Sequence, residues 1–354
     1  MILTELLYLF FTALITFLLY PLWINFVYKF NMGEEIRPDG PQTHKQKQGT
    51  PTMGGFVFIL TVALVTFIFN RSRSQTLFPI FVASLAGLFG IIEDFSKIYK
   101  KSGLPSFFRY KVPAFFKPKL VMLLWYYFKE FWRVVGSKTD RGLQTYQKFL
   151  IQGAIGGFVS YWTYFKLGWD YIWFPLIGDV HIGFLYPVFI FGLFIMVLNF
   201  IAFSDGIDGL VGGLSIISFI AFWVIASILD YNSLAAFAAT FIGALLPFLY
   251  FNVHPARIFM GNVGSHVLGA TMVTIAVIMH KEVALLIICG VMLLDGLSSP
   301  LQQFSVKLTK KRLFRMAPIH HHFELLGWPE TKVTLRFWLF GAFFAFLGIF
   351  IALI

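Results

Sequence analysis

The chain has 354 residues, of which 58% are hydrophobic and only 13% are charged. The apolar residues come in long blocks rather than in short alternations, and this excludes a water-soluble globular domain. Backbone groups in lipid must find their hydrogen-bond partners inside the membrane, so apolar blocks of this length predict helices. The sequence therefore predicts an all-α, polytopic membrane protein that forms a single domain over residues 1–354.

Ten apolar segments are long enough, or nearly long enough, to cross a bilayer as helices of about 20 residues. They are residues 4–28, 52–70, 77–92, 147–165, 183–203, 209–229, 233–251, 264–280, 283–305 and 335–353. The first segment carries Glu5 and lacks the basic start and the small-residue cleavage site of a signal peptide, so we expect it to be retained.

The net charge of +11 is concentrated on one side of this pattern. Loops 29–51, 93–146, 252–263 and 306–334 hold 22 Lys or Arg residues, whereas the loops that alternate with them hold 4. The positive-inside rule assigns the basic loops to the cytoplasm. We therefore expect both termini outside the cell and any site in the basic loops on the cytoplasmic face.

The long basic loop contains an insert at residues 101–138. Within it, Lys117–Arg133 is basic, aromatic and too short to cross a bilayer. This composition is typical of a helix on an anionic lipid surface, and equally of a helix packed on the protein's own cytoplasmic surface. Nucleic-acid binding is not expected, because membrane topology already explains the basic charge. Cys289 lies in an apolar run, which favours a buried small side chain over a reactive thiol.

Two carboxylates, Asp205 and Asp208, lie between glycines at the mouth of an apolar run. Charge is costly to place beside a membrane span, so a functional site is the first hypothesis. At a spacing of three residues the two side chains share one face of a helix, and in a glycine-loosened turn they can converge on one cation. The alternative is a hydrophilic hairpin that only connects two spans.

Two further stretches carry charges that suit phosphate or metal chemistry. Glu93 and Asp94 end the third span with Lys97 one turn later, and adjacent acids can hold Mg²⁺ through oxygen ligands. The alternative is a solvated helix end. Lys47 precedes a glycine-ended run at the second span, where it can contact a phosphate or a base, or serve only as a positive-inside residue.

The last two stretches are rich in Asn, Gly and His. The loop that holds Asn252, Phe259 and Asn262 can bind a planar ring or a sugar, or be an ordinary turn. Residues 320–322 are three histidines in a row, which suggests a metal site, a phosphate clamp or a proton carrier. Consecutive positions on a helix cannot all face one ligand, so we expect one or two of them to contribute.

Four motifs carry a resemblance to one family. They are His-x-x-Lys-x-Gly-Thr-Pro-Thr-Met-Gly-Gly, Ser-Asp-Gly-Ile-Asp-Gly-Leu, Phe-Met-Gly-x-Val-Gly-Ser and Met-Ala-Pro-Ile-His-His-His-Phe-Glu-Leu. On these motifs the chain resembles the phospho-N-acetylmuramoyl-pentapeptide transferases (translocase I), a family of polyprenyl-phosphate sugar-1-phosphate transferases. The match runs from about residue 30 to the C-terminus, interrupted by the insert.

The resemblance implies a multi-pass enzyme of the bacterial cytoplasmic membrane that acts in peptidoglycan synthesis. It implies a Mg²⁺ requirement, UDP-MurNAc-pentapeptide as donor and undecaprenyl phosphate as acceptor. In the family, phospho-MurNAc-pentapeptide moves to the lipid phosphate, giving lipid I and UMP. The family leaves room for a homodimer, and the residues leave open whether transfer is a direct displacement or passes through an aspartyl phosphate.

The resemblance also implies roles for individual residues. The expected catalytic residues are Glu93, Asp94, Lys97, Asp208, His320, His321 and His322. The expected substrate-binding residues are Lys47, Asn199, Asp205, Asn252 and Phe259. The expected metal ligands are Glu93, Asp94 and Asn262.

Three positions depart from the family pattern. Glu93 and Asn262 stand where the family has Asp, and Ala202 stands where it usually has Asn. Glu93 keeps its charge, whereas Asn262 loses one, and this favours an alternative: a catalytically weak homologue that binds UDP-sugar or lipid carrier. A transporter or channel would place its acids near mid-bilayer, whereas these acids gather at one face.

Overall fold

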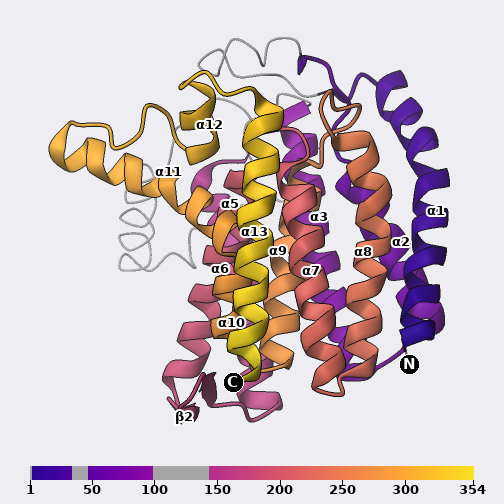
Figure 1. Cartoon of the computed structure of the whole chain (residues 1–354), viewed down its shortest axis with the longest axis vertical. Helices are drawn as coiled ribbons and strands as arrows, with labels where there is room; N and C mark the ends of the chain where they lie inside the picture. The colour runs from indigo at the N-terminus through magenta and orange to yellow at the C-terminus, as the bar shows by residue number, and fades with distance from the viewer. Residues whose placement is uncertain (1, 34–46, 99–142) are drawn as a thin grey trace, which may run out of the picture.

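The computed structural model describes residues 2–33, 47–98 and 143–354, and within them it is a helical bundle (Figure 1). The expected all-α membrane architecture is confirmed. The insert at residues 101–138, including Lys117–Arg133, lies outside the described residues, so its predicted place on the membrane surface stays a prediction.

The chain runs through fourteen described helical segments and one small sheet. The helices are α1 (Ile2–Lys29), α2 (Gly55–Phe69), η2 (Arg73–Leu77), α3 (Phe78–Ile98), α5 (Thr145–Tyr161), η5 (Trp162–Lys166), α6 (Leu185–Ser204), α7 (Leu210–Ile228), α8 (Asn232–Asn252), α9 (Gly261–Ile278), α10 (Glu282–Ile288), α11 (Gly290–Thr309), α12 (Ile319–Glu324) and α13 (Glu330–Leu353). The π-helical turns η2 and η5 directly precede α3 and follow α5, respectively.

Seven of the described helices are long and apolar enough to cross a membrane, or eight if the bent pair α10–α11 counts as one span. The apolar helix α2 is shorter, with 15 residues, and α5 has 17. Figure 1 shows both termini at the same end of the bundle, as an even number of crossings requires. Ten spans and an outside location for the termini agree with this arrangement and stay predictions.

The segment 283–305 was expected to be one continuous span, and this is wrong. The chain bends by 80° between α10 and α11. At the break, Cys289 leaves helical geometry, and a side chain at Gly290 would lie 2.7 Å from the ring of Phe344 on α13. Hydropathy alone does not reveal such a break, because the residues on both sides of it are apolar. Beyond Gly290, α11 points out of the bundle (Figure 1).

The loop between α5 and α6 contains the only sheet among the described residues. Strands β1 (Tyr171–Phe174) and β2 (Gly178–His181) pair antiparallel, with Tyr171 opposite His181. The hairpin lies at the end of the bundle where the termini lie (Figure 1). The residues expected to form the site come from the opposite end.

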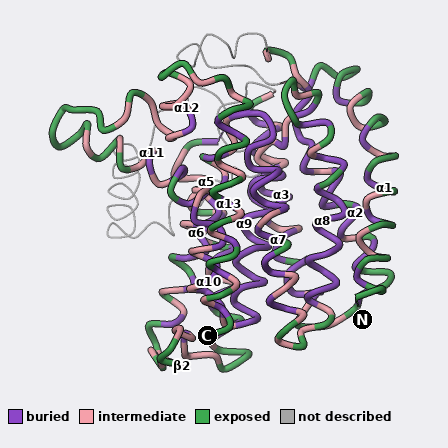
Figure 2. Tube along the Cα trace, viewed as in Figure 1, coloured by how far each residue is buried: buried purple, intermediate pink, exposed green. Residues whose placement is uncertain are grey.

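The buried centre of the bundle lies in α8 and α9, and the outer helices expose apolar side chains (Figure 2). In the hydropathic windows of α9 and α8, 89% and 83% of the residues are buried, against 17% in α1 and 28% in α13. Phe340, Phe346 and Phe350 on α13 are among the exposed rings. An apolar exterior of this kind suits contact with lipid acyl chains.

Helices α3 and α9 cross at very short range. A side chain at Gly90 of α3 would lie 2.5 Å from the backbone of Val263 in the first turn of α9, and one at Gly87 would lie 3.0 Å from Val267. Helices in lipid associate through close packing of small residues rather than through the hydrophobic effect. The glycines therefore set the distance at which the end of α3, with Glu93 and Asp94, meets the start of α9.

We predict that Gly90→Ala lowers the thermal stability of the purified protein, because the new methyl group meets backbone atoms that cannot turn away. Overpacking of this kind costs about 1–3 kcal/mol. The control is Gly157→Ala on α5, where nothing lies within 4 Å of the added methyl group. The measurement is the melting temperature of each variant in detergent. Equal melting temperatures for Gly90→Ala and Gly157→Ala would contradict the close crossing of α3 and α9.

Candidate active site

The polar residues singled out in the sequence gather at the end of the bundle opposite the termini. They come from the α6–α7 turn, the segment before α2, the loop between α8 and α9, and α12 with the start of α13. These segments are far apart in the sequence, and Figure 1 shows them at one end of the molecule.

Asp208 is the centre of the first cluster. Its carboxylate is buried in the turn between α6 and α7. Oδ1 accepts a hydrogen bond from the Lys47 ammonium at 2.7 Å, and Oδ2 accepts one from the backbone N–H of Ala256 at 3.1 Å. Gly209 follows with φ of 75°, a left-handed conformation that favours glycine, and begins α7.

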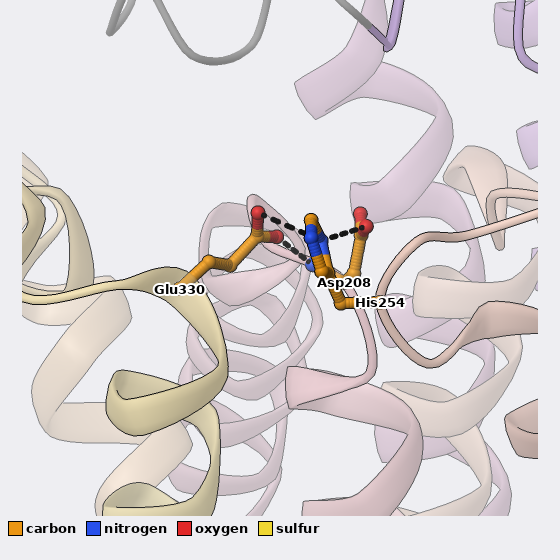
Figure 3. A group of neighbouring side chains, drawn as sticks. All are labelled: Asp208, His254 and Glu330. Atoms are coloured by element: carbon orange, nitrogen blue, oxygen red, sulfur yellow. Dashed lines mark hydrogen bonds and ion pairs between the residues drawn. The ribbon is translucent and has the colours of Figure 1, made fainter.

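Glu330, the first residue of α13, completes this cluster. Its Oε1 accepts hydrogen bonds from Lys47 and from the backbone N–H of Asp208. The His254 ring lies between the two acids, with Nδ1 3.1 Å from Asp208 and 3.5 Å from Glu330, as Figure 3 shows. These three side chains can present one ligand atom each to a metal ion, and Lys47 already offsets part of their charge.

Asn252 ties the cluster to the loop before α9. Its Oδ1 accepts a hydrogen bond from the backbone N–H of Gly209 at 3.1 Å, and its Nδ2 donates to the Ile258 carbonyl at 2.8 Å. The next residue, Phe259, is half-buried and pairs through its backbone with Pro51 and Gly54. The structure thus brings Lys47, Asn252 and Phe259 into one neighbourhood, as expected.

Asp94 lies against the start of α9. Its Oδ1 accepts hydrogen bonds from the side-chain amide of Asn262 at 2.6 Å and from the backbone N–H of Asn262 at 3.2 Å. Oδ2 accepts one from the backbone N–H of Val263 at 3.2 Å. Asp94 therefore serves as an acceptor for the free N–H groups of a helix N-terminus, where a negative charge is stabilised.

Glu93, the neighbour of Asp94 on α3, faces different partners. Its Oε1 lies 2.5 Å from the ammonium of Lys148 on α5 and 3.6 Å from that of Lys97. Its Oε2 lies 3.3 Å from Nε2 of His266 on α9. Both oxygens are thus engaged by nitrogen groups, and Asp94 and Asn262 pair with each other rather than with Glu93.

The first histidine of the triplet packs on the α6–α7 turn. His320 is fully buried, and its Nδ1 lies 2.7 Å from the buried carboxylate of Asp295 on α11, which also accepts the His320 backbone N–H. Its Nε2 has no partner among the described residues. A side chain at Gly206 would lie 2.3 Å from this nitrogen, so the ring abuts the turn between Asp205 and Asp208.

The other two histidines have hydrogen-bond partners of their own. Nδ1 of His321 lies 2.7 Å from Glu324, and Nδ1 of His322 accepts a hydrogen bond from the backbone N–H of Arg315 at 3.1 Å. Nε2 of His321 lies near Gly206 as well, 3.4 Å from the position of a side chain there. The structure therefore brings His320 and His321 to the turn, whereas His322 contacts Arg315 in the loop before α12.

Two expected substrate-binding residues lie at the end of α6. Asn199 exchanges hydrogen bonds with Gln152 of α5, at 2.9 and 3.3 Å. Asp205 is half-buried and follows the last residue of α6, beside Gly206. Asn199 thus links two helices, while Asp205 lies in the turn that His320 contacts.

Comparisons with known proteins match almost the whole chain. The model of glycosyl transferase family 4 matches residues 76–280, and signature 1 of phospho-N-acetylmuramoyl-pentapeptide-transferase matches residues 47–59. The phospho-N-acetylmuramoyl-pentapeptide-transferase of Oceanobacillus iheyensis is 37% identical over 346 residues, which cover 96% of this chain and 94% of the relative. Those of Bacillus subtilis and Anoxybacillus flavithermus are each 35% identical over 342 residues, with the same coverage.

The chain belongs to the phospho-N-acetylmuramoyl-pentapeptide-transferase family. The match to the glycosyl transferase family 4 model includes Asp94, Asp208 and Asn252, and the signature begins at Lys47. The histidine triplet lies beyond both matches and inside the regions shared with the relatives.

Five residues of these clusters were not predicted to act in the site: Lys148, His254, His266, Asp295 and Glu330. His254 lies two residues after Asn252, and Glu330 follows the histidine motif at the start of α13, so both lie outside the four motifs that carried the resemblance. Asp295 is a lone acid in an apolar run, the kind of intramembrane charge that by default marks function. Lys148 and His266 carry no signal in the sequence beyond the polarity of their side chains.

The resemblance to the family implies Mg²⁺, and the donor set tests that implication. Mg²⁺ in proteins is held by one or two carboxylates together with substrate phosphates and water. Asp94 and Asn262 offer one carboxylate and one amide at the same place, which fits this chemistry. The Asp208–His254–Glu330 group offers two carboxylates and an imidazole, but the Lys47 ammonium lies on both carboxylates.

We predict that Lys47→Met lowers stability in this family member, because it leaves the buried carboxylates of Asp208 and Glu330 without their cation. Loss of one partner of a buried ion pair costs about 3–5 kcal/mol. Melting temperature measures the effect, and added Mg²⁺ should restore more stability in Lys47→Met than in the natural chain. Lys166→Met, at an exposed lysine of η5, is the matched control. If both variants melt alike, Lys47 does not hold the cluster together.

Proposed function

We propose that this chain transfers phospho-MurNAc-pentapeptide from UDP-MurNAc-pentapeptide to undecaprenyl phosphate, giving lipid I and UMP. The observation that carries the proposal is the contact between two motifs more than a hundred residues apart. His320 of the histidine triplet abuts Gly206, in the turn that holds Asp205 and Asp208. Lys47 and Asn252 contact the same turn. Membership of the family supports the proposal, and the binding-only alternative is not favoured.

The uridine half of the donor would bind beside Lys47, Asn252 and Phe259, with Asp205 at the edge of the pocket. Asn252 and Lys47 already contact the α6–α7 turn through hydrogen bonds, so their side chains are held in place before a ligand arrives. Phe259 presents a half-buried ring on which a planar base can stack. Binding to a preformed site avoids the cost of ordering these side chains.

Asp94 and Asn262 would hold Mg²⁺ together with substrate phosphates. The ion would supply charge neutralisation for phosphates that must approach one another. Glu93, which was expected to be a third ligand, is engaged by Lys148, Lys97 and His266. We therefore assign Glu93 to these nitrogen groups and leave the metal to Asp94 and Asn262.

His320 would contact the phosphates from the opposite side of the turn. Asp295 binds Nδ1 and the backbone N–H, and this fixes the orientation of the ring and directs Nε2 to the turn. A preorganised nitrogen next to a phosphate stabilises the charge that develops during transfer. Nε2 of His321 lies near the same glycine, so His321 would contact the same phosphate oxygens.

The lipid acceptor would enter through an apolar cavity of about 470 Å³ between α11, α12 and α13. Its wall includes Leu294, Phe323, Phe337 and Phe340, and it reaches Asp295, the partner of His320. The cavity thus reaches as far as Asp295, and its apolar wall suits a polyprenyl chain. Arg336 also lines the cavity, and its guanidinium lies over the ring of Trp328.

Transfer then takes place as a direct displacement. An oxygen of the lipid phosphate forms a bond to the sugar-side phosphorus, the bond from that phosphorus to the bridging oxygen breaks, and UMP leaves with the bridging oxygen and its electron pair. Asp94 and Asp208 are poor nucleophiles here, because their oxygens accept hydrogen bonds from several N–H groups. Exchange of labelled UMP into the donor without lipid phosphate would contradict direct displacement.

A bacterial chain of this kind is a multi-pass protein of the cytoplasmic membrane, with several apolar spans as observed. The basic loops predict that the site faces the cytoplasm, where a UDP-sugar is made. A homodimer stays a prediction.

We predict that the natural chain releases UMP from the donor with undecaprenyl phosphate, slowly and with a raised Mg²⁺ requirement, and that Asn262→Asp lowers the requirement about tenfold or more. A second carboxylate beside Asp94 adds several kcal/mol of attraction for a dication at intermediate dielectric, about 8 kcal/mol at 4 Å. The measurement is UMP release against Mg²⁺ concentration, with the Mg²⁺-dependent rise in melting temperature as a second readout.

Without Mg²⁺, Asn262→Asp should be less stable than the natural chain, because the carboxylate replaces an amide that donates to Asp94. Asn232→Asp, at an exposed position at the start of α8, is the control for an added charge. If the natural chain turns over at ordinary Mg²⁺ and Asn262→Asp slows it, the proposed ligand pair is wrong. If neither chain releases UMP while both bind the donor, the binding-only alternative holds.

We predict that Asp295→Asn lowers the rate of UMP release about 100-fold with little change in donor KM. The amide can present an N–H to Nδ1 of His320 and thereby reverse the tautomer of the ring, and correctly placed proton donors contribute about this much. Asp170→Asn is a matched control, since Asp170 pairs with Nδ1 of the exposed His181 at the other end of the bundle. An equal effect in the two variants would exclude a role for the buried pair.

A further inference from the structure

The β1–β2 hairpin has one face that carries two aromatic rings and an acid. Tyr171 and Trp173 are two residues apart on β1, so their side chains lie on the same face of the strand. Asp179 of β2 is the cross-strand partner of Trp173, which places its side chain on that face as well. The hairpin lies at the end of the bundle opposite the candidate active site (Figure 1). This is the end that the basic loops predict to face outside the cell.

Two residues of the turn between α9 and α10 contact this face. The Lys281 ammonium lies 3.1 Å from the centroid of the Trp173 ring. The His280 ring stacks on Tyr171, with ring centroids 4.5 Å apart and planes at 19°. Together with Tyr231 of the α7–α8 turn, these residues line a cavity of about 250 Å³. Pockets for drug-sized ligands have about 300–1,000 Å³, so this cavity suits a smaller molecule.

The cavity is lined by one acid and one base that do not pair with each other. Lys281 is 7% exposed, and Asp179 is exposed at the surface of the hairpin. Within residues 2–33, 47–98 and 143–354, neither side chain has a hydrogen bond or an ion pair. The Trp173 ring attracts the ammonium through its π-face, but it is not a carboxylate or carbonyl acceptor. The three N–H donors of Lys281 therefore remain available to a ligand.

The charge states of these groups differ in sign. Burial lowers the pKa of Lys281 to about 8, and the nearby carboxylate of Asp179 opposes this shift, so the lysine keeps most of its charge at neutral pH. Burial lowers the pKa of His280 to about 4, which leaves its ring neutral. Glu282, the next acid along the chain, is fully buried in α10 and does not line the cavity. The cavity thus presents one positive and one negative group.

The aromatic rings alone would not indicate a ligand. Trp and Tyr are enriched wherever a membrane protein meets the membrane–water interface, so these rings also suit an interfacial anchor. An anchor does not require a buried ammonium whose donors lack acceptors, and a polar group in that state destabilises a fold. The unpaired acid and base in one cavity are therefore the observation that points to a ligand.

We propose that this cavity binds a small zwitterion, whose anionic group accepts hydrogen bonds from Lys281 and whose ammonium group pairs with Asp179. Such a ligand bridges two groups that do not reach each other, and the rings of Tyr171 and Tyr231 contact its apolar part. Free amino acids and the phosphoethanolamine head group of a lipid share this chemistry. The inference does not depend on the proposed function, because the cavity lies at the other end of the bundle.

Binding to the full-length chain in detergent, measured by calorimetric titration, tests the proposal. Phenylalanine is the first probe, with phenethylamine and 3-phenylpropionate as analogues that lack its carboxylate and its ammonium group, respectively. The variants are Lys281→Met and Asp179→Asn. Lys166→Met and Asp170→Asn are the matched controls, since they remove the same charges from residues near the hairpin that do not line the cavity.

We expect the natural chain to bind phenylalanine about tenfold more tightly than phenethylamine, because hydrogen bonds to the Lys281 ammonium are charge-assisted. Lys281→Met should weaken phenylalanine binding by the same factor and should not weaken binding of phenethylamine. Asp179 is exposed, so Asp179→Asn should weaken phenylalanine binding only about threefold and leave 3-phenylpropionate unchanged. Saturating uridine diphosphate should not displace phenylalanine.

A second pair of probes distinguishes the two sources of the zwitterion. Glycerophosphoethanolamine carries the ammonium group of the lipid head group, and glycerophosphoglycerol lacks it. Tighter binding of glycerophosphoethanolamine than of phenylalanine, with the same dependence on Lys281 and Asp179, assigns the cavity to lipid head groups. The reverse order assigns it to amino acids.

Three results overturn the proposal. The natural chain binds neither zwitterion saturably, or Lys281→Met has no more effect than Lys166→Met, or uridine diphosphate displaces the bound zwitterion. Should Lys281→Met fold poorly, the affinities of the three phenyl compounds for the natural chain and for Asp179→Asn give the same decision. Failure of the natural chain to release UMP contradicts the proposed function alone, since these binding measurements do not involve the active site.

Discussion

The buried carboxylate of Asp208 is the constraint on which the arrangement of the polar end depends. A charge removed from water destabilises the fold unless nearby groups compensate it. Here the compensation comes from Lys47 before α2 and from the loop after α8, through the Ala256 N–H and His254. A single acid thus determines where two distant segments of the chain lie.

Glu330 extends this constraint to the last helix. It adds a second negative charge beside Asp208, and that repulsion is offset because both acids share the Lys47 ammonium. Its Oε1 also accepts the Asp208 N–H, so the start of α13 is joined to the α6–α7 turn. Once α13 is fixed, α12 and its histidine lie over Gly206. These polar contacts thus join α12 and α13 to the α6–α7 turn at this end of the bundle.

The sequence predicts the helical membrane architecture well, because long apolar blocks admit only helices in lipid. It also predicts the convergence of Lys47, Asp208, Asn252 and His320, since motif and charge placement agree. It does not predict the bend at Gly290, where apolar residues continue through a backbone break and Phe344 of α13 leaves no room for a side chain. Hydropathy measures the transfer of side chains into lipid and carries no information on contacts between helices.

The sequence also did not predict which side chains pair with one another in the site. Asp295, Lys148 and His266 act through tertiary contacts, and nothing in their local sequence points to a partner on another helix. Glu93 and Asp94 are neighbours, and adjacency in the sequence suggested a shared metal. On α3 their side chains diverge, and α9 provides a separate partner for each. The two acids thus have separate protein partners, and a metal shared between them stays a prediction.

The charge balance at the end of α3 links the two departures from the family pattern. Glu93 and Asp94 carry two negative charges, and Lys97 and Lys148 carry two positive ones. An aspartate at position 262 would make this region net negative, which favours a dication and opposes an anion. Asn262 leaves it balanced and lets Asp94 keep its hydrogen bonds without a metal. The same substitution that weakens attraction for Mg²⁺ therefore lowers the electrostatic barrier to a substrate phosphate.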